Sequence, residues 1–145
     1  MTLSDLIAGL DVRELRGEVG VEVEALAYDS SEARPGTLFF CVPGQTRDGH
    51  DFAPQALERG ASALVVERPL ELAVTEVVVP DARAAMAPVA ARFWGDPTAK
   101  LRVAGITGTN GKTTTSFLLR EILEHAGVRT GLLGTVKRVV GGIES

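Results

Sequence analysis

The 145-residue sequence has little of three things that help to place a protein in a class: cysteine, excess basic charge and long apolar runs. Its single cysteine, Cys41, cannot form an internal disulfide, and the apolar run around it predicts a packed strand residue rather than a nucleophile. A net charge of −4, with scattered lysines and arginines, argues against a nucleic-acid partner. Since the first residues do not resemble a secretory signal and no uncharged run could cross a bilayer, we expect a cytoplasmic protein without a membrane partner.

The composition is that of a globular protein, with 45% apolar and 23% charged residues, so the chain can bury a core. Apolar residues alternate with acidic ones from Val21, which predicts a half-buried strand running on toward Tyr28. A fully apolar run predicts a buried strand over residues 38–42. Comparable patterns predict helices after a Ser4 cap, over residues 51–59 and from Asp81 to Trp94, and strands over residues 63–67 and 76–79.

Turn-forming residues at positions 95–98 interrupt this alternation, and we place a domain boundary there, between residues 1–97 and 98–145. The second segment predicts a strand over residues 101–106, a glycine-bearing loop, a helix over residues 113–126 and a strand over residues 130–136. The predicted fold class is therefore α/β: a small amino-terminal α/β domain, followed by the first β-loop-α-β unit of a parallel-sheet ATPase domain with a phosphate-binding loop.

The loop between residues 106 and 113 carries the clearest chemistry. Gly108, Asn110 and Gly111 allow the backbone to curl so that N–H groups point toward a phosphate, and the helix that follows adds partial positive charge. Lys112 can reach the terminal phosphates, and the hydroxyl of Thr113 can bind the Mg²⁺ that accompanies ATP. The predicted nucleotide-binding residues are Thr107, Gly108, Thr109, Asn110, Gly111, Lys112, Thr113 and Thr114, with Lys112 as the catalytic residue and Thr113 as the metal ligand.

The loop departs from the usual phosphate-loop pattern, which has a glycine five residues before Gly111. Ile106 stands there, and Gly105 comes one residue earlier. With this displaced glycine, residues 105–115 resemble the ATP loop of the Mur ligases. Residues 29–30, 35–39 and 48–52 are similar to the amino-terminal domain shared by the MurE and MurF branches, and the residues around 131–135 favour the MurE branch.

The resemblance also implies a site in the first domain, for the uridine-diphosphate end of UDP-N-acetylmuramoyl-L-alanyl-D-glutamate. Carried over by position, the substrate-binding residues are Tyr28, Ser30, Gln45, Thr46 and Arg47. Relatives have an arginine after the Asp-Ser pair, where this sequence has Ser31, and Arg34 is near enough to substitute for it. Asp and Ser also form such turns without any ligand, so turn chemistry alone remains an alternative for Ser30.

The function implied by the resemblance is ATP-dependent amide ligation in peptidoglycan precursor synthesis. The D-glutamyl carboxylate attacks the γ-phosphate of ATP, and an amine, diaminopimelate or lysine, displaces phosphate from the acyl phosphate. ATP, Mg²⁺, the UDP-muramyl dipeptide and the amino acid are the implied small-molecule partners, and the whole enzyme would be a monomer. Further metal ligands and the carboxyl-terminal domain of the family would lie beyond residue 145, so we expect a truncated chain that cannot complete catalysis alone.

Three alternatives remain open. A MurF-type ligase would share the same first-domain segments. A non-catalytic UDP-sugar-binding module would bind uridine nucleotides but not ATP. Another phosphate-loop enzyme, such as a small kinase or GTPase, would transfer phosphate to a stable acceptor.

Overall fold

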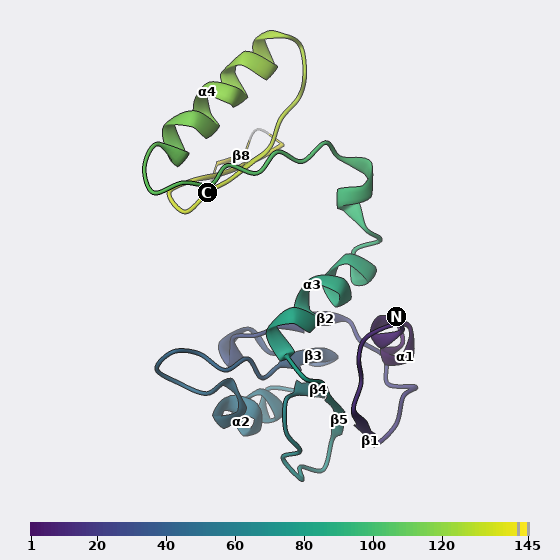
Figure 1. Ribbon diagram of the computed structural model, residues 1–145. Helices are drawn as coiled ribbons and strands as arrows, with labels where there is room; N and C mark the ends of the chain where they lie inside the picture. Colours follow the sequence, from purple (N-terminus) through teal and green to yellow (C-terminus); the bar gives the residue numbers. More distant parts are fainter. Residues whose placement is uncertain (142, 145) are drawn as a thin grey trace. The chain divides into compact units, whose positions relative to one another are not determined.

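The computed structural model describes residues 1–141 and 143–144 (Figure 1). The chain divides into two compact units, Met1–Leu101 and Arg102–Ser145. The predicted second domain includes Gly142 and Ser145, which lie outside the described residues. Assigning muramyl-peptide binding to residues 1–97 and ATP binding to residues 98–145 stays a prediction.

The first unit is built on a five-stranded sheet with the strand order β1-β5-β4-β3-β2. The strands are β1 (Glu14–Arg16), β2 (Ala25–Ala27), β3 (Thr37–Phe40), β4 (Ala61–Val66) and β5 (Thr75–Val78). Strands β2 to β5 pair in parallel, and only β1 runs antiparallel, against β5. This mostly parallel sheet confirms the α/β fold class.

Alternating side chains of the central strands supply the core on both faces of the sheet. In β3, Leu38 and Phe40 join one buried cluster, and Phe39 joins the other. Helices α1 (Leu3–Ile7) and α3 (Ala82–Phe93) contribute to the first cluster, whereas α2 (Ala53–Glu58) contributes to the second. Figure 1 shows α3 and α2 on opposite sides of the sheet. A parallel sheet covered on both faces explains why its central strands read as continuous apolar runs.

Because β2 to β5 are parallel, their carboxyl ends meet at one edge of the sheet. Tyr28 follows β2 at this edge, and the loop of residues 43–48 comes shortly after β3. Ligand sites of α/β proteins form at this edge, so the fold brings the predicted substrate-binding segments to a suitable place.

The amino-terminal elements differ from the prediction in three ways. Thr2 caps α1, accepting a hydrogen bond from the backbone N of Asp5, and Ser4 lies inside the helix, which lets Leu3 enter the core. The predicted strand from Val21 forms only as β2, because the backbone N of Leu3 and that of Val23 bond instead to the carbonyls of Val21 and Met1, respectively. Strand β1 was not predicted, since Leu15 is the single apolar residue in it.

The helix predicted from Asp51 begins later. Residues Gly49–Phe52 form a 3-10 turn, η2, capped by Asp48, and α2 follows it. Gly60 ends this segment with φ +102°, as predicted. Cys41 is buried in the second cluster, and this burial raises the pKa of its thiol to about 12, which confirms a packed residue.

The second unit contains α4 (Lys112–His125) and a three-stranded antiparallel sheet. Its strands are β6 (Leu132–Leu133), β7 (Arg138–Val140) and β8 (Ile143–Glu144). The helix confirms the prediction for residues 113–126, but the strand predicted over 130–136 is reduced to β6. Leu132 and Val139 are buried in this unit, and the apolar stripe of α4 stays half-buried or exposed.

The strand predicted over residues 101–106 is not formed, and this part of the prediction is wrong. Leu101 and Val103 are 65% and 73% exposed. A parallel strand needs hydrogen-bonding neighbours, and none of the strands within the described residues pairs with this segment. Nor is any helix in the described part of the chain long and apolar enough to cross a membrane.

Candidate functional site

The predicted phosphate loop lies at the amino end of α4. Gly111 occupies the N-cap position with φ +76°, a left-handed conformation that favours glycine. A Cβ there would meet no atom within 4 Å, so the requirement for glycine comes from the backbone and not from crowding. Within the described residues no side chain caps α4, and the N–H groups of its first turn are therefore available to an acceptor outside the helix.

Lys112 folds back over this loop. Its ammonium group donates hydrogen bonds to the carbonyls of Gly108 and Thr109, the latter at 3.4 Å. Thr113 lies in the first turn of α4, and residues 107–114 are all exposed. The structure thus places the amine, the hydroxyl and the helix start predicted for phosphate chemistry within one short, accessible segment.

The Asp-Ser turn after β2 is held by its own hydrogen bonds. Asp29 accepts from the backbone N of Ser31 at 2.8 Å and from its hydroxyl at 2.7 Å. These bonds lower the pKa of the Asp29 carboxyl, with the Ser31 hydroxyl as the largest contribution. Ser30 is 8% exposed, and its hydroxyl donates to Oε1 of Gln55 in α2 at 2.5 Å.

An arginine reaches this turn from the C-cap position that follows α2. The guanidinium of Arg59 donates to the carbonyl oxygen of Ser31 at 3.0 Å. The backbone N of Arg34 instead donates to the hydroxyl of Thr37, at the start of β3. Sequence reasoning missed Arg59 because it lies 28 residues from Ser31. The sequence signal that could have indicated Arg59 was its charge at the end of the helix predicted over residues 51–59.

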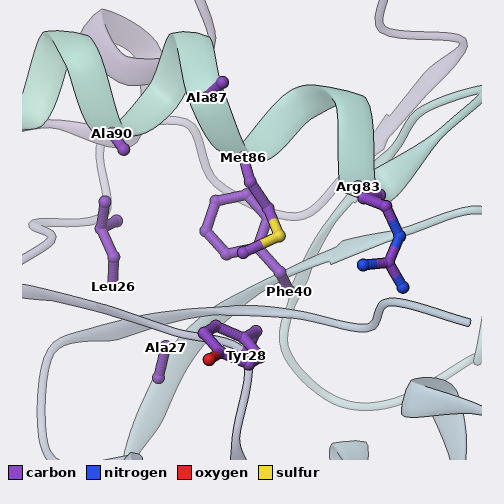
Figure 2. Close-up of a pocket in the computed structure, with 8 residues that line it drawn as sticks. All are labelled: Leu26, Ala27, Tyr28, Phe40, Arg83, Met86, Ala87 and Ala90. Carbon is purple, nitrogen blue, oxygen red and sulfur yellow. The ribbon is translucent and has the colours of Figure 1, made fainter. Parts of the chain in front are cut away.

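Tyr28 lies on the other face of the sheet, beside a pocket of about 310 Å³. The lining residues are Leu26, Ala27, Tyr28, Phe40, Arg83, Met86, Ala87 and Ala90. Figure 2 shows Met86 and Arg83 extending from α3 toward Phe40 and Tyr28. The lining is mainly apolar, and the phenol of Tyr28 and the guanidinium of Arg83 are its polar groups.

Gln45, Thr46 and Arg47 form the exposed tip of the loop of residues 43–48. The backbone N of Gly44 donates to the carbonyl of Arg47 at 2.9 Å, and Pro43 pairs with Asp48 in an isolated bridge. The guanidinium of Arg47 lies 5.9 Å from the ring centre of Phe52, within cation–π range. The loop also contacts α3, because Arg83 donates to the carbonyl of Pro43 at 3.1 Å.

The structure therefore joins the predicted substrate residues only in part. Tyr28 lines a pocket together with residues of α3, and Arg83 of α3 bonds to the loop of residues 43–48, whereas Ser30 is bonded to α2 across the sheet. In the described part of the chain, no three His, Cys, Asp or Glu side chains gather in a way that could hold a metal ion. Thr113 remains the predicted metal ligand.

The fold defines an α/β protein with a mostly parallel sheet, and the loop before α4 has the residue types predicted for phosphate binding. The chain belongs to the Mur ligase family: residues 22–107 match its catalytic domain and residues 106–144 match its middle domain.

The relatives of this chain include proteins named UDP-N-acetylmuramoyl-L-alanyl-D-glutamate--2,6-diaminopimelate ligase. The protein from Geobacillus thermodenitrificans is 54% identical over 120 residues, which cover 83% of this chain and 24% of that protein. The protein from Syntrophomonas wolfei is 44% identical, with 99% of this chain and 30% of that protein covered. The chain thus spans between about a quarter and a third of the length of these relatives.

Solved structures show the same likeness. A structure titled as a UDP-N-acetylmuramoyl-L-alanyl-D-glutamate--2,6-diaminopimelate ligase has a TM-score of 0.77 and 27% identity, with 95% of this chain and 28% of that chain covered. MurF from Acinetobacter baumannii has a TM-score of 0.71 and 28% identity, with 86% and 27% covered. MurF from Thermotoga maritima, solved in complex with ADP, has a TM-score of 0.55 and 31% identity, with 72% and 24% covered.

Proposed function

We propose that this chain supplies the UDP-muramyl-peptide-binding region and the ATP loop of a ligase that adds diaminopimelate to UDP-N-acetylmuramoyl-L-alanyl-D-glutamate in the cytoplasm. The observation that carries the proposal is the continuous match to a ligase of that name across 99% of the chain, through both units. The MurF alternative has less support, because relatives at 42% to 54% identity carry the name of the diaminopimelate ligase. The solved structures do not separate the two branches, since a diaminopimelate ligase and MurF reach similar identities of 27% to 31%.

In this proposal, residues 107–114 bind the ATP phosphates. The exposed N–H groups at the start of α4 donate to phosphate oxygens, and Lys112 lies close enough to the loop to offset charge on the transferring group. The hydroxyl of Thr113 is a hard oxygen ligand of the kind that Mg²⁺ prefers. The ion, when bound, would neutralise phosphate charge. The Thermotoga maritima relative, solved in complex with ADP, supports an adenine nucleotide as a ligand.

Tyr28, Ser30 and the loop tip Gln45–Arg47 bind the uridine-diphosphate end of the substrate in the same proposal. The pocket between Tyr28 and α3 offers an apolar wall, and Arg47 offers a cation at the loop tip. Ser30 contributes through its remaining acceptor capacity, because its proton is directed at Gln55.

Isothermal calorimetry with the 145-residue chain tests both halves of the proposal. We expect separate binding of Mg-ATP and of the UDP-muramyl dipeptide, with Lys112→Ala weakening ATP binding at least about tenfold through loss of a charged donor. Lys100→Ala, which removes an exposed lysine of the 3-10 turn η3 (Pro97–Lys100), is the matched control and should leave ATP binding unchanged.

Calorimetry together with an assay of phosphate transfer distinguishes the alternatives. Uridine-nucleotide binding without ATP binding would indicate a non-catalytic sugar-nucleotide module. Phosphate transfer from ATP to a stable acceptor, without uridine binding, would indicate a kinase. Either result would overturn the proposal.

A further inference from the structure

His50 is a buried histidine with no role in the proposed chemistry. It is 3% exposed and lies in η2, directly after the loop of residues 43–48. Both ring nitrogens have partners: Nδ1 lies 2.6 Å from Oδ1 of Asp48, and Nε2 lies 2.9 Å from the backbone N of Glu67. The ring therefore connects the end of this loop to the end of β4.

These partners determine which form of the ring fits. A backbone N–H can donate only to a ring nitrogen that carries no proton, so the contact with Glu67 requires an unprotonated Nε2. The remaining proton is then on Nδ1 and is donated to the Asp48 carboxylate. The neutral ring satisfies both partners. Removing the ring would leave the partly buried N–H of Glu67 without this acceptor and the Asp48 carboxylate without this donor.

Other contacts extend this connection. The Asp48 carboxylate also accepts the backbone N–H of His50 at 3.0 Å and forms an ion pair with Arg68 at 2.9 Å. The carboxylate of Glu67 accepts from the backbone N of Ala82, at the start of α3. At the other end of the loop, Arg83 of α3 holds the carbonyl of Pro43. Both ends of the loop are thus fixed by polar contacts, and its tip is exposed.

We propose that His50 is a positioning residue: its neutral ring fixes Asp48 to the end of β4, and thereby holds Gln45, Thr46 and Arg47 in the arrangement that binds a diphosphate-linked uridine. The anchoring of the loop stands on the contacts described above. The part that concerns uridine diphosphate rests on the proposed function.

Amide hydrogen exchange measured by NMR on the ligand-free 145-residue chain tests the anchoring. In His50→Ala we expect the amides of Glu67 and Gly44 to exchange at least about tenfold faster than in the unmodified chain, because one loses its acceptor and the other lies in the released loop. His125→Ala is the matched control, because it removes the exposed histidine of α4 in the other unit. It should leave both amides unchanged.

Two conservative variants separate positioning from general packing. His50→Gln keeps an acceptor near the Nε2 position, and should restore slow exchange at Glu67. His50→Asn keeps a donor near the Nδ1 position, and should restore the contact with Asp48 while leaving Glu67 fast. If His50 only filled space in the core, the amide exchange rates of both variants would change with their free energy of unfolding and would not show this residue-specific pattern.

Calorimetry with uridine diphosphate completes the test. We expect His50→Ala to raise the dissociation constant at least about tenfold and His125→Ala to change it by less than about twofold. If His50→Ala unfolds the first unit, Arg68→Met is used in its place, because the Arg68 side chain is 54% exposed and pairs with Asp48. Arg68→Met should weaken uridine-diphosphate binding about twofold to threefold and speed amide exchange at Gly44.

The outcomes distinguish the inference from the function on which it rests. Unchanged exchange and unchanged affinity in a folded His50→Ala chain would overturn the inference and leave the proposed function standing. Absence of uridine-diphosphate binding by the unmodified chain would overturn the proposed function and the ligand part of the inference, while the exchange data would still decide the anchoring.

Discussion

Residues 1–101 bury apolar side chains on both faces of a five-stranded sheet, whereas residues 102–145 leave most of theirs accessible. In the second unit Leu132 and Val139 are buried, but Leu118 and Ile122 of α4 are 59% and 66% exposed. An isolated helix of 14 residues is only marginally stable in water. Local backbone preferences therefore specify the conformation of the loop at Gly111, whereas the conformation of the loop of residues 43–48 depends on a folded core.

The largest expected effect comes from breaking the core of the first unit. Phe39 is fully buried, and Phe39→Ala should reduce the free energy of unfolding by about 3–5 kcal/mol. Leu133→Ala, at a residue of the second unit that is 80% exposed, should change it by less than about 0.5 kcal/mol. Urea unfolding followed by circular dichroism measures both. Similar losses in the two variants would mean that the units do not differ in the way described.

Gly49 tests close packing within the first unit. A Cβ at this position would lie 2.5 Å from the backbone N and O of Val42, so Gly49→Ala forces the backbone apart and should cost about 1–3 kcal/mol. Gly20→Ala is the matched control, because a Cβ there meets nothing within 4 Å. Thermal melting of both variants is the measurement, and a Gly49→Ala chain as stable as Gly20→Ala would show that the loop can move away from Val42.

The helix caps differ between the units, because in the described residues α3 has a side-chain cap and α4 has none. Asp81 caps α3 by accepting from the backbone N of Ala84 at 2.8 Å, so Asp81→Ala should cost about 1 kcal/mol. The exposed Asp11 is the control for loss of charge alone, and Asp11→Ala should have little effect. Chemical unfolding compares the two. An equal effect of both substitutions would assign the loss to charge and not to the cap.

The smallest expected effect is a loss of folding stability at acidic pH. Hydrogen bonds, above all from the backbone N–H of His50, lower the pKa of Asp48 from its usual 3.8 to about 2. A carboxyl whose pKa is lowered by folding stabilises the protein above its unfolded value and loses this contribution as the pH falls. Stability should therefore decrease between about pH 4 and pH 2, by at most about 1 kcal/mol because the side chain is partly exposed.

Unfolding curves of the unmodified chain and of Asp48→Asn over this pH range are the measurement, and the substitution should flatten the dependence. Glu124→Gln is the control in the second unit. The pKa of Glu124 is also lowered, mainly by the hydroxyl of Thr130, but this carboxyl is exposed and its substitution should leave the curve of the first unit unchanged. A curve that stays steep in Asp48→Asn would assign the acid sensitivity to other carboxyls.

Local patterns predicted the elements that local forces determine. The apolar run at residues 38–42 predicted β3, the glycines and Lys112 predicted the helix start at α4, and Gly60 predicted the end of α2. The unpredicted features join distant positions. Strand β1 forms because Leu15 pairs with Val77, and residues 101–106 have no such pairing within the described chain.

The candidate site also contains features set by neighbouring residues and features that join distant residues. Residue types at fixed spacing pointed to the phosphate loop, since its geometry is set within a few residues. Arg59 at the Ser31 turn and His50 at Glu67 are contacts across 28 and 17 residues, which no local pattern encodes. A histidine beside an acidic residue is common on protein surfaces, and only the fold shows that His50 is buried.

The turn after β2 directs two nearby residues toward different helical layers, and this has a consequence for the length of a ligand. Tyr28 faces the layer of α3, and Ser30 is bonded to the layer of α2, although one residue separates them. A single molecule that touches both must extend over the end of an edge strand from one helical layer toward the other, a span on the order of 10 Å. Under the proposed function, a free nucleobase would be too short to touch both residues, and the arrangement would favour a longer, sugar-linked nucleotide.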